Sequence, residues 1–303
     1  MASLLRRLFF LVLAGLFLLP IPCHGGGSLE FRTETKQGTV LLQSFCRRPA
    51  EGEAIMLRLA APPFKTACAV FNGRNHAFTT TGEGKYYFTL IPIELDTPAG
   101  NHEIRLEIVF PDDSTLAAPV SLAVSARTFP SSELSVGSCF TDPSPDELRR
   151  IEEERALVDG IYRNRQNEWL GNGPFISPLD GVVTSPFGIR RLFNGEIRSR
   201  HRGVDLRASE GTPVQAVNSG VVVLARSLFF AGGTVIIDHG ADLFTLYCHL
   251  SEISVNEGGL VDKGTVIGRV GATGRVTGPH LHWGTRLASV FVDPMSILHL
   301  PFD

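Results

Sequence analysis

The sequence predicts a mainly β chain that begins with a β-sandwich of immunoglobulin type and continues through one connecting helix. Two patterns support this fold class: short apolar segments alternate with turn residues over about 100 positions, and a helical period replaces that alternation near residue 145. The length of 303 residues allows roughly two domains, and 43% hydrophobic with 19% charged residues suits a chain that buries a core. The net charge of -3 gives no drive toward nucleic acid, so no such partner is expected.

An export signal is predicted for residues 1–25, ahead of the fold. Arg6 and Arg7 precede an apolar run over residues 8–19, which is shorter than the about 20 apolar residues that a membrane-spanning helix needs. A secretory signal is therefore favoured over a retained anchor. Pro22 occupies the place where a lipoprotein signal carries a small residue, so a lipid anchor at Cys23 is not expected. We expect an exported protein of the periplasm or cell envelope, with no membrane span in its mature part.

Export would allow the remaining cysteines to form disulfides. They are Cys46, Cys68, Cys139 and Cys248, and four cysteines allow three connectivities that the sequence alone does not separate. Pairing of Cys46 with Cys68 is preferred, because both lie in the predicted sandwich. The spacing contains no CxxC pair, which argues against a zinc site made of cysteines.

The predicted sandwich covers residues 28–126. Its strands are indicated by segments rich in Val, Ile, Leu, Phe and Tyr, at 54–59, 67–71, 86–91, 103–109 and 120–124. Turn residues such as those at 72–73 and 98–101 separate them. His76 and His102 stand alone in this region, and isolated histidines are usually structural or surface residues. We interpret the domain as a binding or positioning module without chemistry of its own.

A helix is predicted over residues 145–168, within a linker that spans 127–174. Ser144 can cap its start, Pro145 suits the first helical position, and Glu147 lies three residues after the cap. Residues 148, 151, 155, 158 and 162 then follow at helical spacing. The glycines and proline at 171–174 end the segment, so the helix is expected to connect two domains.

The third segment, residues 175–303, contains the residues that indicate chemistry. Six of the nine histidines lie at or beyond position 201. His280 and His282 would share one face of a strand, about 6.6 Å apart along the backbone, and His249 adds a third imidazole. His201 precedes Asp205 by four residues. Because a straight strand would separate these two by about 13 Å, we expect a bend or irregular backbone around Gly203.

This combination of residue types predicts a zinc site. Catalytic zinc takes three nitrogen or oxygen ligands and keeps a fourth position for water, whose pKa falls to about 7. Two histidines and one aspartate would meet that requirement and leave other histidines free to move protons. The alternative is that the histidines are scattered packing residues, which would be the better interpretation of any one of them alone.

Several motifs follow one another in this segment and together resemble a known family. They lie at 184–191 (TSPFGIRR), 201–205 (HRGVD), 211–214 (GTPV), 235–240 (VIIDHG), 247–250 (YCHL) and 271–283. From about residue 178 to residue 298 the chain resembles the lysostaphin-type (LytM-like) zinc metallopeptidase domain, the family of peptidoglycan endopeptidases. Cys248 stands where a small residue such as Ala is more usual, and this departure alters no ligand.

The resemblance implies one Zn2+ ion held by His201, Asp205 and His282. It also implies that His249 and His280 are the catalytic histidines beside a metal-bound water, and which of them is the general base stays open. The implied fold is a β-rich catalytic domain over residues 175–303, with a groove for an extended peptide. The implied activity is hydrolysis of peptide crosslinks in peptidoglycan, with a D-alanyl to diaminopimelate bond as the expected target.

Two other functions are considered. Some proteins with this domain are non-catalytic regulators of cell-wall amidases and lack metal ligands, whereas this sequence retains all of them. A zinc-storage role is disfavoured, because two spare histidines suit turnover. Arg190, Arg191, Arg198, Arg200 and Arg202 form a basic stretch that fits a solvated loop better than a site for substrate carboxylates. His239 is expected to be structural and His299 incidental.

Overall fold

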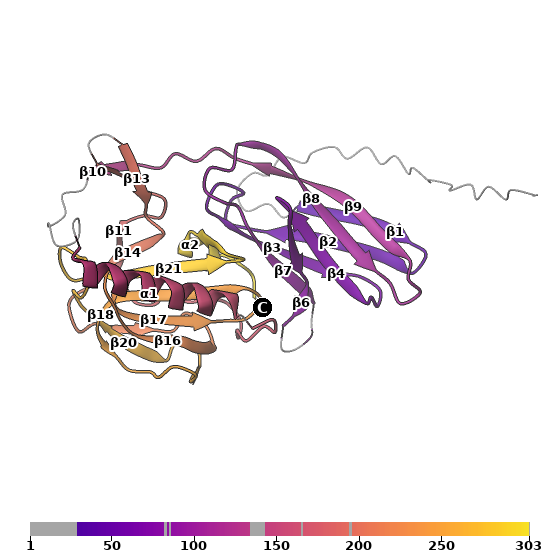
Figure 1. The fold of residues 1–303 in the computed structure, drawn as a ribbon. Coiled ribbons are helices and arrows are strands. Elements are labelled where there is room, and N and C mark those ends of the chain that lie inside the picture. The colour runs from indigo at the N-terminus through magenta and orange to yellow at the C-terminus, as the bar shows by residue number, and fades with distance from the viewer. Residues whose placement is uncertain are drawn as a thin grey trace, which may run out of the picture.

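A computed structural model describes residues 29–81, 84, 86–133, 143–164, 166–193 and 196–302. Over these residues the chain is mainly β, as predicted, and it forms an N-terminal pair of sheets, a helix and a larger C-terminal sheet (Figure 1). The predicted export signal at residues 1–25, Cys23 and Cys139 lie outside the described residues.

The N-terminal domain is built from two antiparallel sheets. The first, in the order β1-β2-β3-β7-β6, contains β1 (Leu29–Thr35), β2 (Gly38–Phe45), β3 (Ala54–Ala60), β7 (Tyr87–Pro92) and β6 (Thr79–Thr80). The second, in the order β5-β4-β8-β9, contains β5 (Arg74–Ala77), β4 (Thr66–Phe71), β8 (Gly100–Val109) and β9 (Thr115–Val124). Apolar side chains of both sheets share one buried core, which is the arrangement of a sandwich. The immunoglobulin topology stays a prediction.

Strand β3 explains how this sandwich joins the rest of the molecule. Its side chains alternate between the two faces of the sheet, so Ile55 and Leu57 enter the sandwich core while Ala54 and Met56 enter a second core shared with the C-terminal domain. In β7, Phe88 is also buried in the shared core. The first sheet is therefore covered on both faces, and the two domains are packed together through apolar side chains.

Aromatic rings from distant parts of the chain fill the contact between the domains. The ring centroid of Phe88 lies 5.3 Å from that of Trp169 and 5.6 Å from that of Phe302. Trp169 belongs to the linker and Phe302 to the C-terminal end, and these two rings stack at 4.8 Å. Linker and C-terminus thus fill the space between the domains.

A buried ion-pair network lies at the same contact. Glu53 has a fully buried side chain that pairs with Arg47 at 2.6 Å and with Arg127 at 3.2 Å. Asp293 of the C-terminal domain pairs with the same two arginines, each at 2.8 Å. Burying a charge is costly unless it is paired, so this network holds together only when both domains contribute their members.

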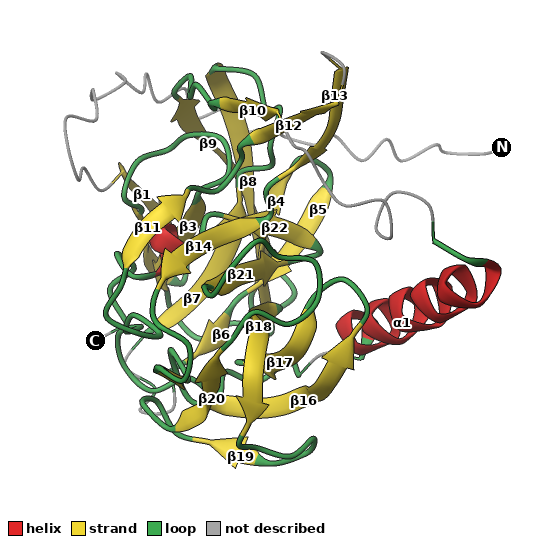
Figure 2. Ribbon diagram, turned by 90° about the vertical axis from the view of Figure 1, so that its left-hand side faces the viewer, coloured by secondary structure: helices red, strands yellow, loops and turns green. Residues whose placement is uncertain are grey.

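Helix α1 (Pro145–Arg163) begins as predicted, with Ser144 and Glu147 forming a complete capping box. It ends at Arg163 rather than at residue 168. Beyond it, the backbone N–H of Gln166 donates to Asp238 Oδ2 at 2.9 Å and directs the chain onto the C-terminal domain instead of continuing the helix. The C-terminal half of α1 packs on that domain through Tyr162, whose ring lies 5.2 Å from Phe244, and the N-terminal end of the helix projects outward (Figure 2). Within the described residues, no helix is long and apolar enough to cross a bilayer.

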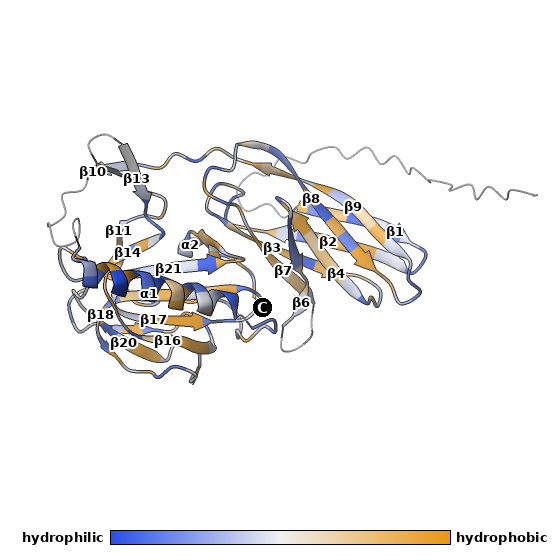
Figure 3. Ribbon diagram, in the orientation of Figure 1, coloured by the Kyte–Doolittle hydropathy of each residue, from blue (hydrophilic) through white to orange (hydrophobic). Residues whose placement is uncertain are grey.

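The C-terminal domain is organised around one large antiparallel sheet in the order β11-β14-β21-β18-β17-β16-β19. Its strands are β11 (Val182–Ser185), β14 (Gly203–Arg207), β21 (Leu281–Leu287), β18 (Leu243–Ile253), β17 (Gly232–Asp238), β16 (Gly220–Leu228) and β19 (Leu260–Val261), with β15 (Pro213–Gln215), β20 (Val266–Val270) and β22 (Val290–Val292) attached and α2 (Pro294–Ile297) after them. The central strands carry mostly apolar residues (Figure 3). A separate small sheet joins β10 (Ser131–Glu133) of the linker to the hairpin of β12 (Arg190–Phe193) and β13 (Glu196–Arg200).

The predicted disulfide between Cys46 and Cys68 is wrong, because Cys68 forms no disulfide. Cys68 lies on β4 in the second sheet, and its Sγ is 3.7 Å from Glu107 Oε2. Cys46 follows β2 in the first sheet. Cys46 packs against the sandwich core, whereas Cys68 lies on the other face of β4, because its neighbours Ala67 and Ala69 are the residues that enter the core.

Candidate metal centre

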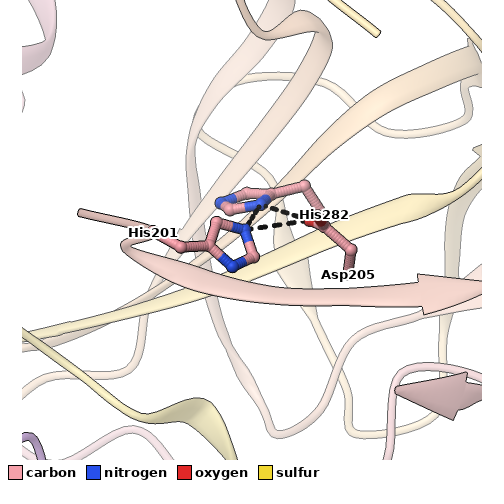
Figure 4. Close-up of side chains that lie close together, drawn as sticks. All are labelled: His201, Asp205 and His282. Atoms are coloured by element: carbon pink, nitrogen blue, oxygen red, sulfur yellow. Dashed lines mark hydrogen bonds and ion pairs between the residues drawn. The ribbon is translucent and has the colours of Figure 1, made fainter. Parts of the chain in front are cut away.

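The three predicted ligands, His201, Asp205 and His282, meet at one point in the C-terminal domain (Figure 4). Strands β14 and β21 are antiparallel, and their register places Asp205 directly opposite His282. Asp205 Oδ1 lies 2.8 Å from His282 Nδ1, and His201 Nε2 lies 3.0 Å from each of these atoms. Residues separated by up to 81 positions thus offer one donor atom each to a common centre.

His201 reaches this centre because it lies outside the strand. Strand β14 begins only at Gly203, and His201 is in the irregular backbone before it, as expected from the spacing of the motif. Its backbone N–H donates to Ile189 O and its carbonyl accepts from Gly188 N–H, both at 2.9 Å. Its ring Nδ1 lies 2.9 Å from Pro186 O. The side chain is 2% exposed, so these contacts hold the ring in one position.

The hydrogen bonds of the ring of His201 determine which of its nitrogens is available. A backbone carbonyl only accepts, so Nδ1 carries the hydrogen that goes to Pro186 O, and Nε2 presents its lone pair. That lone pair faces Asp205 Oδ1 and His282 Nδ1, and such a contact is favourable only with a proton or a metal ion between the atoms. Two imidazole nitrogens and one carboxylate oxygen are a donor set of catalytic zinc, so these residues fit the implied ion.

The electrostatics of the three side chains agree with this donor set. Burial by itself would raise the pKa of Asp205, but hydrogen bonds with His201 and His282 outweigh it and hold that pKa well below its usual range. Burial lowers the pKa of His282, with Asp205 opposing the shift. Metal ligands must be deprotonated, and an ionised Asp205 beside a neutral His282 meets that requirement.

His249 and His280 lie beside the three ligands. Their ring centroids are 4.9 Å apart, and the ring of His249 is 6.1 Å from that of His282. His280 Nε2 lies 3.8 Å from Asp205 Oδ1. All five predicted site residues are therefore neighbours.

The two additional histidines share a feature with His201. Nδ1 of His249 donates to Thr273 O and Nδ1 of His280 donates to Gly278 O, each at 2.9 Å. The bonded nitrogen carries the hydrogen, so Nε2 of each ring is left as the basic atom. Burial lowers the pKa of His249 to about 4, and the neighbouring His282 acts in the same direction. At neutral pH the ring of His249 is therefore unprotonated.

The backbone conformation around the site could not be predicted from the residue types in the sequence. His249 adopts a left-handed conformation, with φ 67, which is uncommon for a residue other than glycine. Gly203 lies against the ring of His282, where an added Cβ would be 2.7 Å from Nε2 and 2.5 Å from Trp283 O. Backbone carbonyls orient the rings of His201, His249 and His280, and backbone acceptors leave no signature in a sequence. The glycine of the HRGVD motif is the one signal that pointed to such a close approach.

Other predicted positions take different roles. His239 is fully buried, with Nδ1 2.8 Å from Ser219 O and Nε2 2.8 Å from Thr245 Oγ1, so it is structural as expected. The interpretation of the basic stretch as a solvated loop is wrong for Arg200. Its side chain is 18% exposed and pairs with Asp96 of the N-terminal domain. In the same basic stretch, the guanidinium of Arg202 lies 5.3 Å from the ring centroid of Phe291. The side chain of Arg198 lies outside the described part.

The C-terminal part of the chain carries a peptidase M23 domain. The model of peptidase family M23 matches residues 199–294, which include all five site residues.

Individual relatives extend this finding. Peptidoglycan DD-endopeptidase ShyA of Vibrio cholerae is 41% identical over 128 residues, covering 41% of this chain and 30% of ShyA. DD-carboxypeptidase/endopeptidase Mpg of Neisseria meningitidis serogroup B is 43% identical over 115 residues, covering 38% of this chain and 26% of Mpg. The chain thus spans less than a third of the length of these curated relatives. A crystal structure from Pseudomonas aeruginosa assigned to peptidase M23 is 28% identical with a TM-score of 0.63, covering 83% of this chain and 96% of that one. The structural likeness therefore extends beyond the M23 segment.

Proposed function

We propose that this protein is a zinc-dependent endopeptidase that hydrolyses peptide crosslinks of bacterial peptidoglycan. The observation that supports this most directly is the meeting of five side chains from three distant stretches, three with converging donor atoms and two with basic ring nitrogens beside them. The match to family M23 and the names of the curated relatives support the same activity and substrate class.

In this proposal His201, Asp205 and His282 hold the zinc ion. When bound there, zinc would polarise the scissile carbonyl and lower the pKa of a water molecule to about 7. The chain's own contribution is to hold the ligands in one protonation state. The hydrogen bond from His201 Nδ1 to Pro186 O does so for one ring, and the low pKa of Asp205 does so for the carboxylate.

His249 and His280 would move the protons. Each ring is oriented by a hydrogen bond from Nδ1 to a backbone carbonyl, so Nε2 is the atom available to the reaction. One Nε2 would accept a proton from the attacking water and return it to the amine nitrogen as the C–N bond breaks, while the other ring, in its protonated form, would stabilise the oxyanion. The order in which the two rings act is not assigned.

The substrate is proposed to be a crosslink between two peptide stems, with a bond from D-alanine to diaminopimelate as the expected target. Two of the curated relatives named above are described as DD-peptidases, which favours a bond of this kind. Such a substrate lies outside the cytoplasm, so an exported protein of the periplasm or cell envelope is part of the same proposal.

The test is incubation of isolated peptidoglycan with protein that lacks residues 1–25, followed by mass spectrometry of the released muropeptides. We expect release that a chelator stops and added zinc restores, with the masses identifying the bond. His282→Ala should lose both zinc and release. Absence of any chelator-sensitive release would reject the enzyme and favour the non-catalytic amidase regulator, which would instead raise the activity of an added amidase.

A further inference from the structure

The ligand His201 is held in a different way from the other two. Asp205 and His282 lie on β14 and β21, which pair with each other inside the large sheet. The backbone N–H and carbonyl of His201 make their hydrogen bonds to residues 188 and 189, and its ring Nδ1 donates to Pro186 O at 2.9 Å, with Ser185 Oγ of β11 at 3.2 Å. We call residues 186–189 the His201 cradle. The position of His201 Nε2 therefore depends on what holds the cradle.

The cradle is held by the N-terminal half of the chain. Phe187 is 1% exposed, and its ring packs on Gly52 of the sandwich so closely that an added Cβ would lie 2.5 Å from Phe187 Cε1. Gly188 lies against the ring of Phe129, where an added Cβ would overlap the ring. Phe129 is itself buried and follows the last strand of the sandwich by only a few residues. Two consecutive cradle residues thus contact the N-terminal half.

A second connection reaches His201 through its neighbour in the chain. Arg200 pairs with Asp96 of the sandwich, and its guanidinium lies 5.8 Å from the ring centroid of Phe129. The guanidinium of Arg127 lies 4.8 Å from the centroid of the same ring and belongs to the buried ion-pair network between the domains. The ring of Phe129 therefore has three neighbours: Arg127 of the ion-pair network, Arg200 next to His201, and Gly188 of the cradle. Through this ring the ion pairs between the domains are connected to the segments that hold His201.

We propose that the N-terminal sandwich, together with Phe129 just after it, is a positioning element of the metal centre: by fixing the cradle it places His201 Nε2, and so sets the affinity for zinc. This rests on the proposed function, because it assumes that His201 is a zinc ligand. The physical reason is preorganisation. A ligand already held in the bound geometry loses little conformational freedom when the metal binds, and residues that orient ligands typically change metal affinity roughly 10- to 100-fold when removed.

The test compares Phe129→Ala with Phe88→Ala in the full chain. Both variants remove a buried phenylalanine near the contact between the domains, but only Phe129 touches the cradle. Zinc alone is the probe, with its dissociation constant measured by competition against a chromophoric chelator. The absorption spectrum with cobalt(II) in place of zinc reports the number of ligands. Thermal unfolding of the metal-free variants measures the general loss of stability.

We expect Phe129→Ala to weaken zinc binding roughly 10- to 100-fold and to change the cobalt spectrum. Phe88→Ala should lower the unfolding temperature while its zinc affinity stays within about twofold of wild type. Equal weakening in both variants, or wild-type affinity in Phe129→Ala, would overturn the inference. If Phe129→Ala does not fold, Asp96→Gly decides, because this exposed residue has a positive φ of 69 that glycine adopts without strain, and its replacement leaves the core intact. About threefold weaker binding there supports the inference, and unchanged binding overturns it.

Failure of the proposed function gives a different result. In that case wild type would bind no stoichiometric zinc, or His201→Ala would bind it as tightly as wild type does. Either outcome would show that His201 does not hold zinc, and the sandwich would then have no zinc ligand to position. The variants of Phe129 and Phe88 separate the two questions only after wild type has been shown to bind.

Discussion

Two histidines of the C-terminal domain, the fully buried His239 and the partly buried His249, differ in the partners of their ring nitrogens. Burial lowers the pKa of both His239 and His249 to about 4. Both ring nitrogens of His239 have polar partners, Ser219 O and Thr245 Oγ1. His249 uses only Nδ1, and among the described residues its Nε2 makes no hydrogen bond but faces a region with two more imidazoles. A shifted pKa alone does not mark a reactive residue, whereas an available nitrogen in a cluster does.

The largest expected effect tests this comparison directly. His249→Gln should lower the rate of crosslink hydrolysis roughly 10²- to 10⁴-fold, because it removes a group proposed to transfer protons. Zinc content should stay at the wild-type level, since His249 is not a proposed ligand. Steady-state rates on a defined crosslinked muropeptide, together with metal analysis, measure both quantities.

His239→Gln is the matched control. It should leave the rate per folded molecule unchanged while destabilising the protein by about 1–3 kcal/mol, because a buried hydrogen-bond network loses a partner. A loss of rate in His239→Gln equal to that in His249→Gln would contradict the distinction between the two environments.

The pH dependence of stability provides the second test, on metal-free protein. The pKa of His239 is about 4 in the folded chain and 6.5 as its ordinary value, so the unfolded chain binds more protons between these values. The free energy of unfolding should therefore rise as the pH increases from about 4 to about 6.5, with about 3 kcal/mol from this residue. Chemical denaturation at several pH values measures it.

The same variant is the control here. His239→Gln should flatten the rise of unfolding free energy with pH, because glutamine does not titrate. His76, whose pKa burial and Arg74 lower to about 4, contributes a rise of the same sign in the sandwich. An unchanged slope in His239→Gln would show that its pKa in the folded chain is not depressed.

The third effect concerns the ring of His282. Gly203→Ala should weaken zinc binding roughly 10- to 100-fold, because the new methyl group would lie 2.7 Å from His282 Nε2 and would displace a ligand. Chelator competition measures the affinity. Gly211→Ala is a suitable control for the substitution itself, since nothing lies within 4 Å of its added Cβ, although its φ of 83 makes some loss of stability expected. Wild-type affinity in Gly203→Ala would show that the sheet can yield at this position.

Residue patterns predicted the chemistry of the site better than the contacts that hold it. The five site residues could be named because imidazoles and a carboxylate that recur in ordered motifs are typical of metal and acid–base sites. The start of α1 could be located from Ser144 and Glu147, whose capping interactions are local. Its end could not, because it depends on Asp238, which lies 72 residues beyond the donor Gln166.

The same limit accounts for the two other wrong predictions. The basic stretch predicts a solvated loop at Arg200, but the partner of this residue, Asp96, is 104 residues away in the chain. Cys46 and Cys68 are near in sequence, but Cys46 packs against the sandwich core and Cys68 lies on the face of β4 away from it. Both outcomes depend on how the layers pack, and this depends on the summed burial of many side chains rather than on any local motif.

The smallest expected effect concerns His299, and it tests most closely what distinguishes His249 from the other histidines. His299 has the same bonding pattern as His249, since its Nδ1 lies 2.9 Å from the carbonyl of Met295. By the criterion of an available nitrogen alone, the two rings are equivalent. His299, however, is exposed, and no other imidazole or carboxylate contacts its ring among the described residues. His299→Ala should therefore change neither the rate nor zinc affinity, and should alter stability by no more than about 0.5 kcal/mol.

A substantial loss of hydrolysis in this variant, measured beside His249→Gln, would mean that a free ring nitrogen matters by itself. Unchanged hydrolysis would show that the arrangement around Asp205, and not the bonding of any single ring, makes a histidine functional here.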